Sequence, residues 1–402
     1  MTHAPDPFET LEATLGDRAL YPELEDVYLG WAAIAPASTL VRAQVGAFLS
    51  DYAKGGLSGF GRWLGQRARL KERAAAFVGA EATDLAFCQS TTQGIIALAR
   101  SIDWKPGDRV ILFDGEFPAN VTPWQRVAVD FGLELVTVPL APFFRSHEEG
   151  LAALSHELRK GARLVAVSAV QFQSGLRMPI EAIAKASHAT GAEIFVDAIQ
   201  ALGVVPFDVG RGTDAAIDYA ATGGHKWLAG LEGAGFVYVA PERVAALEPR
   251  MAGWLSHEGA LDFLLAGSGH LRYDRAVRKS ADFLEPGAQS HIGLAALEAG
   301  LAPLQHLGPG AILAHVQTLH DRYEAIFREH GFGSLRTEEP EGRSGILSFE
   351  CPESVDPIAL QHGLRDDGIV VAIPDGLIRV APHWPNDLAE CERVAKALSE
   401  LL

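Results

Sequence analysis

Short apolar runs, many of them rich in β-branched residues, recur along the first 240 residues of the chain. Runs of this length between polar or glycine-containing segments predict buried strands. The seven predicted strands are residues 85–88, 110–113, 133–138, 163–170, 192–198, 217–222 and 235–240. Segments with helical spacing of their apolar positions lie between several of these runs, for example at 91–102 and 179–190. Strands that alternate with helices indicate an α/β fold with a mainly parallel central sheet and helices on both faces.

The alternation of strands and helices stops after about residue 255, and the segment that follows shows no regular spacing of its apolar residues. The elements predicted beyond this point are helices at 291–307 and 312–330, strands at 345–351, 368–374 and 377–382, and a closing helix at 387–402. This order predicts a smaller C-terminal α+β domain that a long helix connects to the main sheet. We therefore expect an N-terminal arm (1–30), a large domain (31–270), and a connecting helix with the small domain (271–402).

Composition narrows the classes of function without identifying one. With 48% hydrophobic and 21% charged residues, the 402-residue chain is typical of soluble globular proteins. A formal charge of −17 argues against nucleic acids and anionic membrane surfaces as partners. No run approaches the ~18 apolar residues that span a bilayer, and the polar, acidic start of the chain does not resemble a secretory signal. The cysteines Cys88, Cys351 and Cys391 fit neither a disulfide framework nor a metal pair, so we expect a cytoplasmic protein.

Ligands in open α/β sheets collect at the carboxyl ends of the strands, and the segment STTQG (90–94) directly follows the first predicted strand. Hydroxyl groups and free backbone N–H groups at a helix N-terminus suit a phosphate. The alternative is that Ser90 or Thr91 only caps the next helix.

Asp197 stands at the end of the strand predicted at 192–198, and Gln200 follows three residues later. A carboxylate that ends a buried strand must be paired or protonated. A protonated pyridine nitrogen would satisfy this requirement, and Gln200 could then reach a neighbouring oxygen of the same ring. The alternatives for Asp197 are an ordinary helix cap or a buried salt bridge.

Lys226 lies in GGHK (223–226), within one of the most apolar and glycine-rich parts of a chain that has only eight lysines. A partly desolvated amine near other cations has a lowered pKa, which makes it a base and a nucleophile able to form a Schiff base. The flanking glycines let the backbone approach a bound ring closely, and His225 could donate to a phosphate oxygen. The alternative is a lysine whose side chain extends from the loop into solvent.

A phosphate cradle, a carboxylate for a pyridinium and a lysine for an aldehyde are the three groups that pyridoxal 5′-phosphate (PLP) requires. Together with these groups, the chain contains the stretches STTQGI, DGEFPANVTPW, QFQSGLRMPI, VDAIQALG, GGHKWLAGLEGAGFVYV and IRVAPHWPN. With these stretches, the chain resembles the class V aminotransferase family of fold type I PLP-dependent enzymes over most of its length. That branch includes cysteine desulfurases, selenocysteine lyases and isopenicillin N epimerase-like enzymes.

The resemblance implies a role for each matching residue. Lys226 would form the Schiff base and carry the proton at Cα of the substrate, and Asp197 would keep the pyridine nitrogen protonated. The residues expected to bind the cofactor are Thr91, Thr92, Phe117, Asp197, Gln200, Thr222, His225 and Lys226. Gln200 would bond the ring 3′-oxygen, and Phe117 would stack on the ring where relatives often have histidine. Arg379, inside the apolar run LIRVAP, would bind the substrate carboxylate, with a surface salt bridge as the alternative.

The chain also departs from the family pattern. Cysteine desulfurases carry a reactive cysteine shortly before the arginine strand, and GIVVAIPDGLIRV (368–380) has none, which disfavours persulfide chemistry. A serine common before Gly-His-Lys is Gly223 here, so Thr222 is the remaining hydroxyl. The threonine by which a partner subunit often contacts the phosphate is replaced by Ala288, which leaves Gln289 or Ser290 as donors.

Other functions of α/β proteins lack their motifs. No GxGxxG follows an early strand, GLSGFG (56–61) does not complete GxSxG, and no phosphate loop of the form GxxxxGK[ST] occurs. HEGAL (257–261) lacks the second histidine of a zinc site, so we expect no metal centre. A protein of this fold that has lost catalysis and serves as a binding module is the alternative of a different class.

We therefore expect a homodimeric PLP enzyme that acts on a small amino acid through Lys226, with transamination as its reaction. The dimer is implied by the resemblance, because both subunits usually line each active site in this group. A C–S or β-lyase and an amino-acid epimerase of the same family remain open, since they share the removal of the Cα proton and differ only in the step after it.

Overall fold

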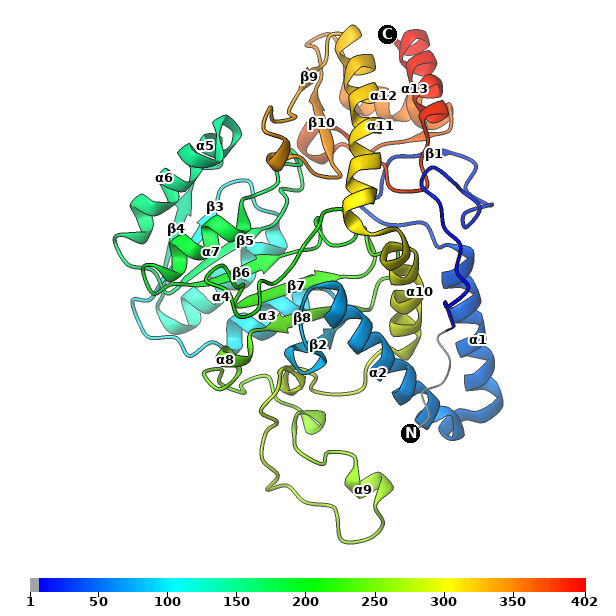
Figure 1. Cartoon of the computed structure of the whole chain (residues 1–402). Helices are drawn as coiled ribbons and strands as arrows, with labels where there is room; N and C mark the ends of the chain where they lie inside the picture. Colours follow the sequence, from blue (N-terminus) through cyan, green and yellow to red (C-terminus); the bar gives the residue numbers. More distant parts are fainter. Residues whose placement is uncertain (1–6) are drawn as a thin grey trace.

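The computed structural model describes residues 7–402, so the first six residues of the expected N-terminal arm lie outside it. Its main element is a seven-stranded sheet (Figure 1). In spatial order the strands are β2 (Leu85–Cys88), β8 (Gly235–Val239), β7 (Tyr219–Gly223), β6 (Glu193–Asp197), β5 (Leu164–Ser168), β3 (Arg109–Phe113) and β4 (Glu134–Val138). Of these seven, β8 alone runs against the others, because it pairs antiparallel with both β2 and β7. The predicted mainly parallel sheet is confirmed, and each strand starts and ends within two residues of its prediction.

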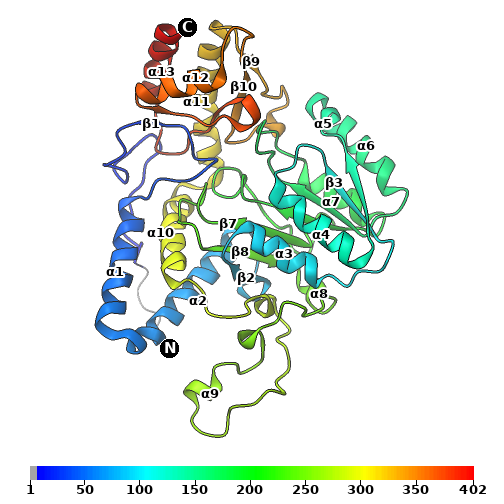
Figure 2. The ribbon, with the colours of Figure 1, turned by 180° about the vertical axis from the view of Figure 1, so that it is seen from behind.

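Helices cover both faces of this sheet. They are α2 (Phe60–Phe77), α3 (Thr91–Ser101), α4 (Thr122–Phe131), α5 (Ala141–Arg145), α6 (His147–Leu158), α7 (Ile180–His188), α8 (Pro241–Val244) and α10 (His291–Leu307). Successive strand residues point to opposite faces, so Val165 and Ile194 pack with α6 and α7, whereas Leu164 and Phe195 pack with α3 and α4. Figure 1 shows the side of α6 and α7, and Figure 2 shows the side of α3 and α4.

Helix α10 has the predicted bounds and is buried along most of its length, with 12 of its 17 residues inaccessible to solvent. The reason is that α1 (Thr39–Gly55) and α2 pack against it on one side while its leucines reach the core of the main sheet on the other. The sequence pattern did not single out α1, of which only Val41 and Phe48 are buried.

The C-terminal elements form a second, smaller layer. A sheet in the order β12-β10-β9 packs with three helices. Its elements are β9 (Gly333–Ser334), β10 (Leu347–Glu350), β12 (Ile378–Val380), α11 (Pro309–Glu329), α12 (Pro357–Asp366) and α13 (Leu388–Leu401). This agrees with the α+β character expected for the small domain, whereas the boundaries proposed for the three parts of the chain stay predictions.

The strand predicted at 368–374 is much shorter in the structure and has an unexpected partner. Only β11 (Ile369–Val370) is a strand, and it pairs in parallel with β1 (Val27–Tyr28) from the beginning of the chain. Gly30 then bridges to Ala381. The segment around β1 therefore runs across the C-terminal layer before it enters the main body, as the dark blue trace in Figure 1 shows.

A segment around α9 (Asp262–Leu265) projects away from the rest of the chain (Figure 1). It coincides with the region after residue 255 in which the sequence shows no period. Several of its large apolar side chains are exposed, including Leu264, Leu271 and Tyr273. Among residues 7–402, no helix has the length and apolar character needed to cross a membrane.

Candidate active site

A cavity of about 480 Å³ lies beyond the carboxyl ends of β2, β6 and β7, between the main sheet and the C-terminal layer. These three strands run in the same direction, so the residues that follow them meet at one edge of the sheet. The cavity is lined by eight of the side chains predicted from the sequence: Thr91, Thr92, Phe117, Asp197, Gln200, His225, Lys226 and Arg379. Thr222 is the exception, because it is buried in β7 and its Oγ1 donates to the Gly223 carbonyl oxygen at 3.3 Å.

One end of the cavity is built on the first turn of α3. Ser90 is the N-cap of this helix, and its Oγ accepts a hydrogen bond of 3.2 Å from the Gln93 backbone N–H. Thr91 is not needed as a cap, and its buried Oγ1 has no hydrogen-bond partner within residues 7–402. Capping therefore accounts for Ser90 and leaves the Thr91 hydroxyl free beside the N-terminal N–H groups of a helix, an arrangement suited to an anion.

Gly223 and His225 bound the same end. A Cβ at Gly223 would lie 3.1 Å from His225 Nδ1 and 3.2 Å from Thr91 Oγ1. The absence of a side chain therefore keeps a small recess open between the Thr91 hydroxyl and the His225 ring. Burial lowers the pKa of His225, and the neighbouring Lys226 charge lowers it further.

Lys226 and Asp197 approach the cavity from adjacent strands, β7 and β6. Burial lowers the pKa of Lys226 to about 8; the Asp197 charge opposes this shift, and the Arg379 charge adds to it. Burial also raises the pKa of Asp197, against the effect of a 3.0 Å hydrogen bond from the Ile199 backbone N–H. Both groups are thus pushed toward their neutral forms, and such shifts in a cavity are typical of functional sites.

Gln200 and Phe117 lie beside this pair. Gln200 Nε2 donates to the Ala32 carbonyl oxygen at 3.0 Å, and its Oε1 accepts from Trp227 Nε1 at 2.8 Å. One of its two amide hydrogens is therefore still available to a ligand. The Phe117 ring lies with its centre 5.6 Å from Lys226 Nζ, which places an aromatic face next to the amine.

Arg379 approaches the cavity from the C-terminal layer. It lies in β12 between Ile378 and Val380, which face the core of that layer, so its own side chain points the other way, into the cavity. Its guanidinium donates to the Phe172 carbonyl oxygen at 2.8 Å, and its Nε has no partner in the described part of the chain. Burial lowers the pKa of Arg379 to about 10. A surface salt bridge does not explain this arginine, because it is 6% exposed and no described carboxylate pairs with it.

The sequence did not single out two further features of the site. The first is Phe172, which lines the cavity and packs edge-on against Phe117 with 5.1 Å between ring centres. The second is Glu116, a buried carboxyl that accepts hydrogen bonds from the backbone N–H and hydroxyl of Ser168 and from Gln171 and Asn120. Both lie in stretches quoted for the resemblance, but their contacts depend on segments about 50 residues apart.

A model of the aminotransferase class-V family matches residues 27–377. The chain belongs to the class-V aminotransferase family. Its relatives include isopenicillin N epimerase of Streptomyces clavuligerus, 27% identical over 340 residues that cover 83% of this chain and 84% of the relative. A probable cysteine desulfurase of Methanothermobacter thermautotrophicus is 26% identical over 409 residues, covering 94% of this chain and 96% of the relative.

Solved structures share the fold of this chain. The apo cysteine desulfurase from Thermococcus onnurineus superposes with a TM-score of 0.81 at 24% identity, covering 94% of each chain. A cystine C–S lyase in complex with cysteine persulfide gives a TM-score of 0.85 at 20% identity, covering 94% of this chain and 99% of the other. The predicted fold type I arrangement is therefore confirmed. Class-V aminotransferases are PLP-dependent enzymes, so this protein is a PLP-dependent enzyme.

The residues of this class-V family member fit the cofactor. An unpartnered buried hydroxyl at Thr91 and the recess at Gly223 suit a phosphate group. Asp197 is 3% exposed and accepts a single hydrogen bond from a described residue, that from Ile199, so it can still pair with a ring nitrogen. Lys226 lies next to it as the amine. The set holds donors for the phosphate, an acceptor for the ring and a nucleophile for the aldehyde.

The cysteines of the chain take no part in the lining of this cavity. None of Cys88, Cys351 and Cys391 is among the residues that line it. Burial raises the pKa of Cys88 to about 12 and that of Cys391 to about 11, so neither is a thiolate at neutral pH. Both thiols pack in apolar surroundings, Cys88 against the core on the α3 and α4 side of the main sheet and Cys391 in the core of the C-terminal layer.

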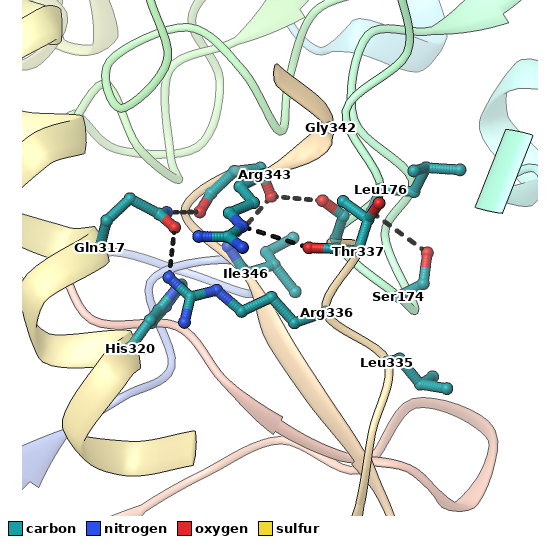
Figure 3. Close-up of a pocket in the computed structure, with 12 residues that line it drawn as sticks. Ser174, Leu176, Gln317, His320, Leu335, Arg336, Thr337, Gly342, Arg343 and Ile346 are labelled. Carbon is teal, nitrogen blue, oxygen red and sulfur yellow. Dashed lines mark hydrogen bonds between the residues drawn. The ribbon is translucent and has the colours of Figure 1, made fainter. Parts of the chain in front are cut away.

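Two other cavities lack this chemistry. The larger, of about 660 Å³, lies over α7 and includes no residue predicted to bind the cofactor. The smaller, of about 10 Å³, lies between α11 and the segment that leads to β10 (Figure 3). There His320 Nε2 and Arg336 Nε have no partner among the described residues, and the volume matches a single water molecule.

Proposed function

We propose that the protein transfers the amino group of a small amino acid by PLP-dependent transamination. The observation that carries this proposal is the convergence of Asp197, Lys226 and Arg379 on one cavity in which Lys226 is the one amine and no described cysteine takes part. Bound PLP supplies electron withdrawal, which makes the α-proton of an attached amino acid acidic.

Each residue would have a distinct task in this reaction. Thr91, Thr92 and His225 would bind the phosphate, and Gln200 would donate its free amide hydrogen to the ring oxygen. Asp197, ionised once a cationic ring nitrogen faces it, would keep that nitrogen protonated. Phe117 would cover one face of the ring. These assignments are supported by the unpartnered Thr91 hydroxyl, the free Gln200 hydrogen and the burial of Asp197.

Arg379 would bind the α-carboxylate of the substrate, because a guanidinium donates to two carboxylate oxygens at once. With the carboxylate held there, the substrate amine is directed toward the Lys226 side of the cavity. Lys226, with its lowered pKa, would then accept the Cα proton as a neutral amine near physiological pH.

The residues that line the cavity favour transamination over epimerisation and over transfer of sulfur to a protein cysteine. One base can move a proton between neighbouring positions on one side of a ring, and Lys226 suffices for that. Inversion at Cα by two bases calls for a second proton carrier besides Lys226, and the other ionisable groups of the described lining, Asp197, His225 and Arg379, are assigned to the ring nitrogen, the phosphate and the carboxylate. Transfer of sulfur to the protein as a persulfide calls for a cysteine nucleophile, and no described cysteine lines the cavity. A β-lyase reaction needs no such cysteine, so the experiment below distinguishes it from transamination.

We also propose that the protein acts as a homodimer in the cytoplasm. The exposed apolar side chains of the projecting segment around α9 support self-association. The three cysteines are all free, which agrees with a reducing compartment.

The reaction class is tested by incubating the PLP-loaded protein with single amino acids and a labelled 2-keto acid. Transamination predicts a labelled amino acid and an equal amount of a new keto acid. Formation of the D-amino acid without keto acid would instead show an epimerase, and release of ammonia with pyruvate would show a β-lyase. Either of these two results would overturn the proposal.

A further inference from the structure

The side chain of the substrate must lie near Arg379, because Arg379 fixes the α-carboxylate in the proposed function. Ala372 and Arg379 are opposite residues of an antiparallel bridge, in which each backbone N–H donates to the other's carbonyl oxygen at 3.3 and 2.8 Å. Side chains of such a pair lie on the same face, about 5.5 Å apart at Cα. The Ala372 methyl group is therefore a direct neighbour of the bound substrate.

Several further residues that line the cavity are apolar. Ala32 and Ala33 approach from the segment after β1, Phe172 comes from the loop after β5, and Pro374 follows Ala372. Each of these side chains consists of carbon and hydrogen only, and Ala32 is held in place by the hydrogen bond from Gln200 to its carbonyl oxygen. A substrate side chain that extends from Cα would therefore contact methyl groups, a proline ring and an aromatic ring.

The ionisable groups that line the cavity are already assigned. They are Asp197, His225, Lys226 and Arg379, which serve the ring nitrogen, the phosphate, the amine and the α-carboxylate. In the part of the lining that residues 7–402 of one chain supply, no further cation is present to pair with a side-chain carboxylate, and no further anion is present to pair with a side-chain ammonium. Asp375 follows the lining residue Pro374, and its exposed carboxylate accepts a hydrogen bond of 3.2 Å from Gln173 Nε2. At this position it would repel an acidic side chain that approaches Pro374.

We propose that the substrate is an α-amino acid with an uncharged, apolar side chain, such as an aliphatic one, selected by the wall that Ala32, Phe172, Ala372 and Pro374 form beside Arg379. This inference rests on the proposed function, since it uses Arg379 as the carboxylate site. A charged side chain would lose its hydration without gaining a partner, which is unfavourable. Dicarboxylic substrates are disfavoured most, because Asp375 repels them as well.

The test compares amino acids on the PLP-loaded enzyme by kcat/KM. L-Leucine and L-methionine should exceed L-glutamate and L-aspartate by roughly 100-fold or more, with L-arginine and L-lysine in between. Calorimetric binding of two carboxylates that cannot react, 4-methylpentanoate and glutarate, should show the same preference. A higher kcat/KM for L-glutamate than for L-leucine would overturn the inference and leave transamination intact. Absence of turnover with every amino acid would overturn the proposed function and with it this inference.

A pair of variants tests the wall itself. Ala372→Arg places a cation beside Arg379 and should raise kcat/KM for L-glutamate relative to L-leucine by roughly 100-fold. Ala372→Gln adds a polar side chain without charge and is the control. An equal shift in both variants would contradict the role of charge at this position. If Ala372→Arg does not fold, the comparison of amino acids and carboxylates on the unaltered enzyme decides the question.

Discussion

The three charged residues of the site, Asp197, Lys226 and Arg379, are held in a partly dehydrated cavity in which none has an ideal partner. Burial pushes the pKa values of Lys226 and Asp197 toward neutrality, and Arg379 retains an unpartnered Nε. Buried groups of this kind lower the stability of the ligand-free protein, and they stabilise the complex when a ligand of complementary charge is bound. The site is therefore prepared for a cofactor with an anionic phosphate and a basic ring nitrogen, and for a substrate carboxylate.

Substitution of Thr91 distinguishes a role in binding the cofactor from a role in stabilising α3. Because its hydroxyl has no partner among the described residues and Ser90 already caps α3, Thr91→Val should leave the free energy of unfolding of the PLP-free protein unchanged within about 0.5 kcal/mol. The same variant should weaken PLP binding by roughly 10-fold, since one hydrogen bond to a charged phosphate is lost. Denaturant unfolding and absorbance titration with PLP measure the two quantities. A destabilised protein with normal PLP affinity would show that Thr91 serves the helix.

The lowered pKa of Lys226 predicts a specific pH dependence. An amine attacks an aldehyde only in its neutral form. The rate at which PLP attaches to the PLP-free protein should therefore rise with pH up to about 8, where Lys226 loses its proton, and level off above that. An ordinary lysine would keep the rate rising to about pH 10.4. Stopped-flow absorbance between about pH 6.5 and 9.5 distinguishes the two curves, and a continued rise of about tenfold per pH unit beyond about pH 9 would contradict the prediction.

At the scale of elements, the cavity depends on a loop after β5 that rests on the small sheet. Three side chains of the C-terminal layer donate to carbonyl oxygens of this loop: Arg379 to Phe172, Ser348 to Gln173, and Ser344 to Gly175. Ser348 and Arg379 are opposite residues of β10 and β12. The same face of that sheet therefore holds both the predicted carboxylate site and the loop that carries Phe172.

Ser348→Ala should loosen this loop. The variant leaves the partly buried Gln173 carbonyl oxygen without the donor that the fully buried Ser348 supplies, so the free energy of unfolding should fall by about 1–2 kcal/mol. KM for the amino acid should rise as Phe172 becomes less well placed. Ser399→Ala is the control, because it removes an exposed hydroxyl, far from the cavity in sequence, that bonds the Ala395 carbonyl oxygen and His330 Nε2. Unfolding midpoints and steady-state kinetics that match the control would contradict this coupling.

The sequence predicted the strands of the main sheet well because each is a short apolar run, most of them buried on both sides. It did not predict the pairing of β1 with β11, since two residues near position 27 and two near 369 carry no local sign of each other. The same difference holds for the candidate site: residues that the local sequence marks could be predicted, and residues that act through distant contacts could not. Lys226 and Asp197 could be found because charged residues are rare in apolar strand ends, whereas Phe172 and Glu116 act through contacts with distant segments. Gln200 was found for its ring contact, but its hydrogen bonds to Ala32 and Trp227 were visible only in the structure.

At the scale of the whole molecule, the projecting segment around α9 is the feature that a single chain does not explain. Leu264, Leu265, Leu271 and Tyr273 are exposed there, with Tyr273 91% accessible. Exposed apolar groups gathered on one segment are typical of an interaction surface. We expect this segment to be buried in the proposed homodimer.

Leu264→Glu should therefore weaken self-association. A carboxylate placed in an apolar interface is unfavourable, so the dissociation constant of the dimer should rise by roughly 10-fold or more. Leu388→Glu is the matched control, because Leu388 lies in α13 with 52% exposure against 57% for Leu264. Sedimentation velocity over a concentration series measures the effect. Equal dissociation constants for both variants would place the interface elsewhere.

The measurement that tests the central claim most directly is a single turnover of the PLP-loaded enzyme with an amino acid and no keto acid acceptor, monitored by visible absorbance and keto acid assay. Transamination predicts loss of the visible band, release of about one keto acid per bound PLP, and recovery of the band when a keto acid is added. Lys226→Ala should show none of these changes. A Lys226→Ala protein that released keto acid at the normal rate, or an unaltered enzyme that released none with any amino acid, would contradict the proposed reaction.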